Sequence, residues 1–352
     1  WLQMLTVLSF LVLLPTGEHF HIVTALPTLF FARGEPGRRV PSVDLERVMN
    51  AADGEEVAVG ARTARDLSWK DGLDAFTCTE CGRCKDACPT FLTGKPLAQK
   101  WVHDSIKHHL LERRDAILAT PTADAPDALP SLVPDVIGED TLWACTTCGY
   151  CESACPIELE HLPKFYRLRQ QRVMMEGAFP HELKAVFDAY ESQSNPWGLS
   201  ADTRGDWAKS LGIPVVSSPE AMRDHEWLYY VGSAASFDPR GQKIATAFAT
   251  VLRHAGVRFA ILGAAETSTG ECVRRLGNEM LFQALAEPLV GTLNGLGVAR
   301  IVTTDPHAFN SLRHEYPAFG GHYEVVHHTQ LLARLIEAGR AAPVPQVSRV
   351  LF

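Results

Sequence analysis

The sequence has few positively charged residues relative to negative ones, and few cysteines outside two short segments. Its 352 residues include 33 lysines and arginines against 41 aspartates and glutamates, for a formal net charge of -8. That balance, with no basic run carrying interleaved aromatic residues, argues against a nucleic-acid-binding protein. Only one of the 9 cysteines lies outside two short segments. A disulfide framework of the kind found in short secreted chains is therefore not predicted, and a reducing compartment is indicated.

The cysteines that are present follow one spacing twice. The two runs are Cys78, Cys81, Cys84, Cys88 with Pro89, and Cys145, Cys148, Cys151, Cys155 with Pro156. This C-x2-C-x2-C-x3-C-P spacing is that of bacterial two-cluster ferredoxins, in which the fourth cysteine of a run binds the other cluster. The sequence therefore predicts two [4Fe-4S] clusters. Their predicted ligands are Cys78, Cys81, Cys84 and Cys155 for site I, and Cys145, Cys148, Cys151 and Cys88 for site II.

Structural zinc is the alternative to clusters, because each run contains CxxC pairs and zinc binds four thiolates in a closed tetrahedron. The ligand pairs of a zinc site normally come from separated knuckles. A third cysteine at the same short interval, followed by proline, has no role in such a site. The spacing therefore favours iron–sulfur clusters and electron transfer. Backbone amides around Gly82 and Gly149 are predicted to donate to cluster sulfurs.

The N-terminus lacks an apolar run of full membrane-spanning length. Residues 1–15 are mostly apolar, whereas a span needs about 20 residues, so we predict that residues 1–32 are the end of a transmembrane segment. A basic region and a cleavage site, as in a signal peptide, are not visible. Arg33, Arg38, Arg39 and Arg47 follow the apolar part, which predicts that the rest of the chain is cytoplasmic. The alternative is a buried helix of a soluble core.

Two histidines lie at the predicted membrane surface. His19 and His21 flank Phe20, where imidazole could ligate haem b or line a quinone pocket. The alternative is that both rings are simply solvated at the interface. We predict them as candidate cofactor-binding residues.

The rest of the chain is predicted to be helical first and α/β later. The expected parts are a connector at 33–68 with one helix at 43–51, a two-cluster domain at 69–192, a linker at 193–225 and an α/β domain at 226–352. Helices are expected at 95–118, 162–190, 238–255, 271–294 and 331–339, and strands at 227–232, 257–262, 299–304 and within 314–328. Strands alternating with helices predict an open parallel sheet. The fold class is therefore α plus α/β.

The chain resembles the membrane-anchored iron–sulfur reductases related to the heterodisulfide reductase D-type subunit. The resemblance is carried by the paired cysteine runs, NPWG at 195–198, RRLGNEMLFQALAE at 274–287 and the segment 306–332. It is greatest to the fused form found beside electron transfer flavoproteins, whose membrane part is similar to the nitrate reductase gamma subunit. The resemblance implies an oxidoreductase of the cell membrane with haem b as a further cofactor. It also implies electron transfer flavoprotein, or another redox partner, and membrane quinone as partners.

The α/β part departs from that family where cysteines are expected. Ser233, Ser268, Asp305 and Ala308 occupy those positions. Because these residues cannot replace soft thiolates, we predict that this half holds no metal, and that Cys272 is a leftover thiol without a catalytic role. The second cysteine-rich half of the family is missing, so the sequence looks like an internal fragment.

The predicted function is an electron relay from a reduced partner to haem or quinone. One alternative is an iron–sulfur subunit of a lactate, glycolate or glycerol-3-phosphate oxidising complex, although the apolar N-terminus argues against it. Another is a noncatalytic module whose α/β half docks a partner. Neither the direction of electron flow nor any catalytic residue follows from the sequence.

Overall fold

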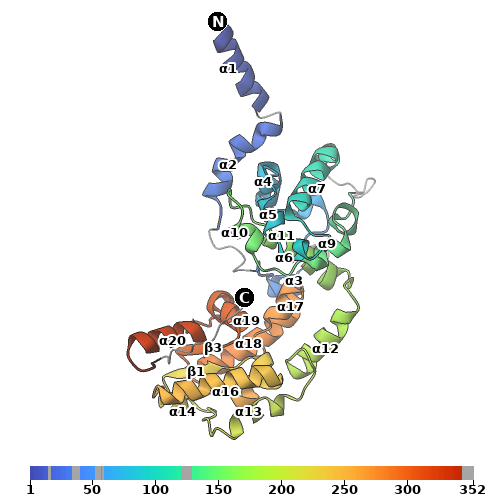
Figure 1. Cartoon of the computed structure of the whole chain (residues 1–352). Coiled ribbons are helices and arrows are strands. Elements are labelled where there is room, and N and C mark those ends of the chain that lie inside the picture. Colours follow the sequence, from blue (N-terminus) through green and yellow to red (C-terminus); the bar gives the residue numbers. More distant parts are fainter. Residues whose placement is uncertain (15–16, 34–39, 52–56, 58, 120–128, 343–352) are drawn as a thin grey trace. The chain divides into compact units, whose positions relative to one another are not determined.

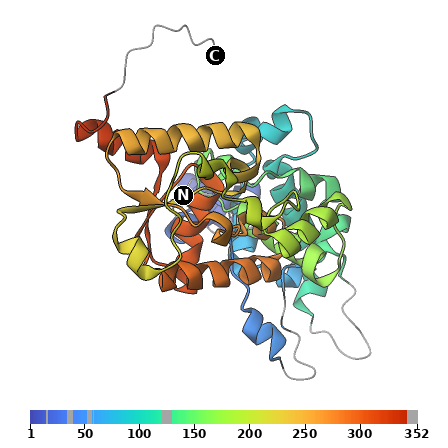
Figure 2. The same ribbon diagram turned by 90° about the horizontal axis from the view of Figure 1, so that it is seen from below.

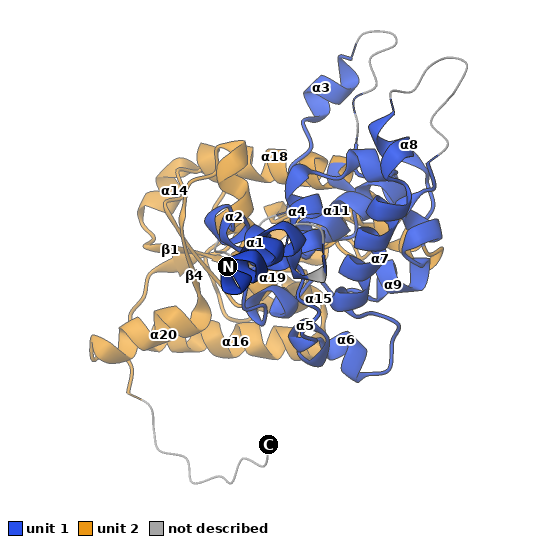
Figure 3. Cartoon of the chain, turned by 90° about the horizontal axis from the view of Figure 1, so that it is seen from above, with its two compact units in different colours: residues 1–179, 275–279 blue, residues 180–274, 280–352 orange. Residues whose placement is uncertain are grey.

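The computed structural model describes residues 1–14, 17–33, 40–51, 57, 59–119 and 129–342 (Figure 1). The chain forms two compact units, coloured separately in Figure 3. Unit 1 comprises Trp1–Phe179 together with Arg275–Glu279, and unit 2 comprises Pro180–Arg274 and Met280–Phe352. The division along the chain therefore falls near residue 180, and a short later segment returns to unit 1.

The described residues of unit 1 form helices joined by turns and loops, without β-strands. Its helices are α1 Leu2–Leu13, α2 His21–Phe30, α3 Leu45–Met49, α4 Trp69–Thr77, α5 Arg83–Asp86, α6 Pro89–Leu92, α7 Gln99–Glu112, α8 Arg114–Leu118, α9 Glu139–Ala144, α10 Tyr150–Ser153 and α11 Leu162–Gln170. Ser68 begins α4 with a capping box, in which its hydroxyl accepts from the Asp71 N–H and the Asp71 carboxylate accepts from the Ser68 N–H. The cap fixes where α4 begins, and the helix ends at Thr77, so that Cys78 follows α4 directly.

The core of unit 1 forms around α11. Phe165, Tyr166 and Leu168 are almost wholly buried there. They belong to one apolar cluster that also contains Cys88 and Cys145. Two of the predicted cluster ligands are therefore built into the hydrophobic core rather than into a surface loop.

The N-terminal helices differ in how they are held. Every residue of α1 is exposed or partly exposed. In contrast, α2 packs on α4, where the Thr28 and Thr77 hydroxyls are 2.9 Å apart and buried, and where Phe20 meets Phe76 edge to face. In the described part of the chain, no helix combines the length and the apolar character that crossing a membrane requires.

Unit 2 is an α/β unit. Its elements are α12 Glu182–Gln193, α13 Asp206–Lys209, α14 Pro219–Arg223, β1 Trp227–Tyr230, α15 Ser233–Phe237, α16 Pro239–His254, β2 Phe259–Ala260, α17 Glu271–Arg275, α18 Glu279–Gly295, β3 Arg300–Thr303, α19 Pro306–Asn310, β4 Glu324–His327 and α20 His328–Glu337. All strand pairs are parallel, in the order β2-β1-β3-β4. The predicted parallel sheet is confirmed.

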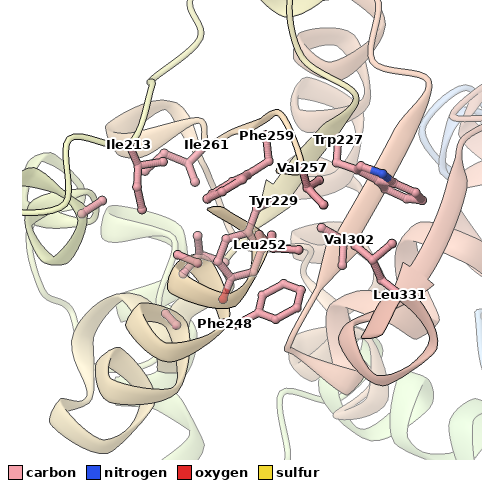
Figure 4. Close-up of a cluster of buried hydrophobic side chains, with 14 of the residues drawn as sticks. Ile213, Trp227, Tyr229, Phe248, Leu252, Val257, Phe259, Ile261, Val302 and Leu331 are labelled. Atoms are coloured by element: carbon pink, nitrogen blue, oxygen red, sulfur yellow. The ribbon is translucent and has the colours of Figure 1, made fainter. Parts of the chain in front are cut away.

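Helices cover both faces of this sheet. α16 and α20 lie along one face and α18 lies along the other (Figures 2 and 3). Because side chains alternate along a strand, Trp227 and Tyr229 of β1 join the cluster with Phe248 and Leu252 of α16 (Figure 4). All four residues of β1 are buried, so both faces of this strand are covered, as expected for a parallel sheet.

The structure corrects three helices that periodicity predicted. The helix expected at 271–294 is divided into α17 and α18, and the helix expected at 95–118 is divided at Arg113 into α7 and α8. Residues 162–190 form α11, a π-helical turn at Gln171–Met175 and part of α12 instead of one helix.

Gly277 gives the physical reason for the first of these breaks. Its φ of +97° is far from helical, and a Cβ there would lie 2.5 Å from the backbone carbonyl carbon of Arg169. The backbone around Gly277 therefore fits against α11 only without a side chain. This contact also explains why the segment Arg275–Glu279 belongs to unit 1.

Candidate iron–sulfur centre

The eight cysteines of the two runs line two pockets in unit 1. One pocket is lined by Cys78, Cys81, Cys84 and Cys155, and the other by Cys88, Cys145, Cys148 and Cys151. These are the residue sets defined above as site I and site II. In each pocket, three cysteines come from one run and the fourth comes from the other.

Both runs share one backbone conformation. Glu80 and Thr147, two residues after the first cysteine of each run, both have φ of +55°. Gly82 and Gly149 both have a left-handed backbone conformation and are the N-cap residues of α5 and α10. These two short helices pack against each other. In the second run, the Thr147 N–H donates to Cys145 Sγ at 3.4 Å. The turns therefore point backbone donors at cysteine sulfur, an arrangement that stabilises a negatively charged thiolate.

Burial disfavours the charged thiolate form of several cysteines in sites I and II. It raises the pKa of Cys78 and Cys145, and it raises that of Cys84 to about 11. Nearby thiols add to the shift, because Cys155 acts on Cys78 and Cys88 acts on Cys145. Four such sulfurs become thiolates together only when positive charge lies between them. The iron of a bound cluster would supply that charge.

The donor sets fit [4Fe-4S] clusters. Soft thiolates are the usual ligands of such clusters, and four of them surround each pocket. Among the residues that the structure describes, no group of three or more His, Cys, Asp or Glu side chains is arranged to hold a metal ion. A single zinc ion needs all four sulfurs about 2.3 Å from one centre, whereas a cubane binds its thiolates at separate corners. Metal analysis distinguishes the two.

Arg169 of α11 donates hydrogen bonds to backbone carbonyls at the start of the second cysteine run. Its side chain is buried, and it donates to the carbonyl oxygens of Cys145 at 2.6 Å, Leu142 at 2.9 Å and Arg275 at 2.9 Å. Its guanidinium also lies over the Trp143 ring. One buried cation thus connects the end of α9, the first predicted ligand of site II and Arg275, the last residue of α17.

The sequence reasoning missed a buried polar group beside site I. His161 lines the site I pocket, and its Nδ1 lies 2.8 Å from Nε2 of His103 in α7. Lys164 Nζ is 3.4 Å from the same His103 nitrogen. The position of His161 shortly after Cys155 was the only available signal, and it does not separate a buried histidine from a surface one.

Neither N-terminal histidine lines the site I or site II pocket. His19 belongs to the 3-10 turn before α2 and His21 begins α2, and their rings stack with centroids 6.1 Å apart. Binding of haem b by either one stays a prediction.

Unit 2 has a cavity of about 320 Å³ at the carboxyl ends of β1 and β3. Ser233, Ser268 and Asp305, which occupy positions where the resemblance expects cysteine, line it together with Cys272. Ala308 is buried and is not part of that lining. The substituted positions therefore converge in space. The expectation that this half holds no metal stays a prediction.

The family model of the 4Fe-4S dicluster domain matches residues 70–156, a range that contains all eight cysteines of sites I and II. The chain therefore contains a ferredoxin-type 4Fe-4S domain. No solved structure matches the chain.

Its relatives are iron–sulfur oxidoreductases. A probable iron-sulfur-binding oxidoreductase, FadF, from Bacillus subtilis is 38% identical over 97% of this chain and 52% of its own length. The EtfAB:quinone oxidoreductase of Syntrophomonas wolfei is 34% identical over 97% and 50%. A probable membrane-anchored ferredoxin from Chromohalobacter salexigens is 33% identical over 85% and 47%. More distant matches are heterodisulfide reductase subunits D of Methanosarcina.

The chain is thus related to iron–sulfur reductases of the heterodisulfide reductase D type, as the sequence predicted. It spans about half the length of the FadF and EtfAB:quinone oxidoreductase relatives named above.

Proposed function

We propose that this chain relays electrons from a reduced partner, such as an electron transfer flavoprotein, towards membrane quinone through [4Fe-4S] clusters at sites I and II. One observation carries the proposal: eight cysteines line two pockets in unit 1, four in each. The similarity to an EtfAB:quinone oxidoreductase over 97% of the chain supports this choice of donor and acceptor. A bound [4Fe-4S] cluster supplies the chemistry by accepting and releasing one electron.

The contribution of the chain is to hold, shield and pair these sites. Cys84 and Cys151 are buried, which keeps bulk water from one ligand of each site. The Cys84 sulfur also acts electrostatically on Cys151, so the two sites are neighbours. Exchange of the fourth ligands would lock both runs into one unit and keep the distance between the clusters short. A short distance favours electron exchange between them.

Site I is proposed as the site nearer the membrane. α2 packs on α4, and α4 is followed directly by Cys78, the first predicted ligand of site I. α1 exposes apolar side chains along its whole length, and one relative is named a probable membrane-anchored ferredoxin. We propose that α1 and α2 attach the chain to the membrane and that electrons leave through site I. His19 and His21, at the start of α2, are candidates to face haem b or quinone.

Metal analysis of anaerobically purified protein tests the cluster assignment. We expect about eight irons and about eight sulfides per chain, because each cubane contributes four of each. Reduction is expected to produce the electron paramagnetic resonance signals of [4Fe-4S] clusters. Cys272→Ser is the matched control, because this exposed cysteine lies outside both sites and its replacement leaves the iron count unchanged. Colourless protein that contains zinc would contradict the proposal.

Vesicle binding tests the membrane attachment. Replacing Leu8 and Leu11 of α1, which are 51% and 57% exposed, with lysine is expected to weaken binding to neutral phosphatidylcholine vesicles at least about tenfold, because charge is costly in the bilayer interior. Met280→Lys and Ile336→Lys, at comparably exposed apolar positions of unit 2, are the controls and should leave binding unchanged. Equal binding by both pairs of variants would exclude α1 as the attachment.

A further inference from the structure

A pair of buried histidines lies between α7 and site I. The rings of His103 and His161 meet edge to face with centroids 4.6 Å apart, and Nε2 of His103 is 2.8 Å from Nδ1 of His161. Both side chains are almost completely buried. Burial, with the nearby charge of Lys164 adding to it, lowers the pKa of each well below its usual value. Each ring is therefore neutral and carries one N–H.

His161 has one nitrogen left for the cluster site. Its Nδ1 is occupied by His103, whereas its Nε2 is buried and has no hydrogen-bond partner among the described residues. The residue also forms part of the wall of the site I pocket. A buried polar atom without a partner costs free energy, so its position in this wall indicates a partner that the bound cluster supplies.

The backbone N–H of His161 is bound by a residue next to a predicted ligand of site II. The Glu152 carboxylate, one residue after Cys151 of site II, accepts from the N–H of His161 at 2.8 Å and from that of Leu162 at 2.7 Å. Glu152 is itself buried. The imidazole is therefore held in place at both its backbone and its Nδ1, which is the rigidity that a directional hydrogen bond requires.

The position of the proton between the two rings determines whether Nε2 of His161 is a hydrogen-bond donor or an acceptor. If His103 Nε2 donates to His161 Nδ1, the single proton of His161 is on Nε2 and is available to a group in site I. In the opposite tautomer a bare lone pair faces the negatively charged sulfurs, which repels them. Lys164 Nζ, 3.4 Å from His103 Nε2, would favour that opposite tautomer when charged, but it already donates to the Glu160 carbonyl at 2.7 Å. The Asp74 backbone carbonyl, which accepts weakly from the His103 ring, favours the opposite tautomer as well. The first arrangement therefore requires that the negative charge of the bound cluster outweigh both groups.

We propose that His161 donates a hydrogen bond from Nε2 to a sulfur of the cluster at site I and raises the reduction potential of that cluster alone. Reduction adds one electron and makes the sulfurs more negative, so the hydrogen bond is stronger in the reduced state. His161 is a positioning residue with His103 behind it, and no histidine is among the described residues that line the site II pocket, where Gln99 is a buried polar side chain. This inference rests on the two-cluster function proposed above.

Spectroscopy and potentiometry on the full chain test it. In protein with ¹⁵N-labelled histidine, pulsed electron paramagnetic resonance of the reduced clusters is expected to detect a weakly coupled histidine nitrogen. His161→Leu should abolish that coupling. It should also disfavour reduction of one cluster about tenfold, the effect of one lost hydrogen bond, which corresponds to 59 mV for one electron. The cysteine variants described in the Discussion show which signal belongs to site I.

Two further variants separate tuning from structural damage. His161→Gln keeps an N–H donor and should restore most of the potential. His109→Leu removes a buried histidine of α7 that lines neither pocket, and it should change neither potential. The inference is overturned if the wild-type protein holds both clusters but shows no histidine coupling, or if His161→Leu keeps both clusters and shifts neither potential or both equally. Loss of the cluster in His161→Leu leaves the decision to the wild-type coupling. Absence of iron from the wild type, in contrast, would overturn the two-cluster assignment itself.

Discussion

Replacing Cys78 and Cys155 together with serine is expected to remove one cluster and leave the other, so that about four irons per chain remain. Replacing Cys78 and Cys88 together is expected to remove both clusters. Each double variant deletes two thiolates, and Cys78 and Cys88 even belong to the same run. The difference arises because Cys78 and Cys155 line one pocket, whereas Cys88 lines the other with Cys145.

Iron and sulfide analysis of the anaerobically purified variants measures this difference. Cys88→Ser with Cys145→Ser is the reciprocal variant and should retain the site I cluster, whose electron paramagnetic resonance signal is then seen alone. The opposite pattern would show that each run binds its own cluster with all four of its cysteines. In that case Cys78 with Cys88 would lose one cluster, and Cys78 with Cys155 would lose both.

Replacing Glu266 with leucine is expected to destabilise unit 2 by about 3–5 kcal/mol, because it leaves a buried guanidinium without its counter-charge. The Glu266 carboxylate accepts from Arg204 Nε at 3.2 Å and from the N–H groups of Val231 at 2.8 Å and Gly232 at 2.9 Å. Both charged side chains are at most 2% exposed. This cluster holds the turn that follows β1, at the edge of the sheet where the unit 2 cavity lies.

Denaturant unfolding followed by tryptophan fluorescence measures the loss, since Trp207 and Trp227 are buried in the core of unit 2. Glu226→Leu is the matched control: it removes an exposed ion pair with Arg258 and should cost less than about 1 kcal/mol. Arg204→Met combined with Glu266→Leu should recover much of the stability, because no charge is then buried alone. Equal losses for Glu266→Leu and the control would show that the buried pair does not stabilise this turn.

The helix predicted at 271–294 shows where sequence patterns are insufficient. Its apolar residues follow a helical period on both sides of Gly277, and one glycine within such a pattern is often tolerated in a helix. What ends α17 is a contact with Arg169, more than a hundred positions earlier in the chain. No periodicity within the segment contains that information. The parallel sheet, in contrast, was predictable, because each strand is a local apolar run followed by a helix.

The sequence by itself determined the ligand chemistry and the alternation of elements, because thiolates a few residues apart and apolar periods are local properties of the chain. Only the tertiary structure decided which groups meet at the sites. His103 and His161 come from separate helical segments, Arg169 reaches both Cys145 and Arg275, and Ser233 and Asp305 share one cavity. These contacts depend on how helices and strands pack, and packing is set by the combined burial of many side chains rather than by any single motif.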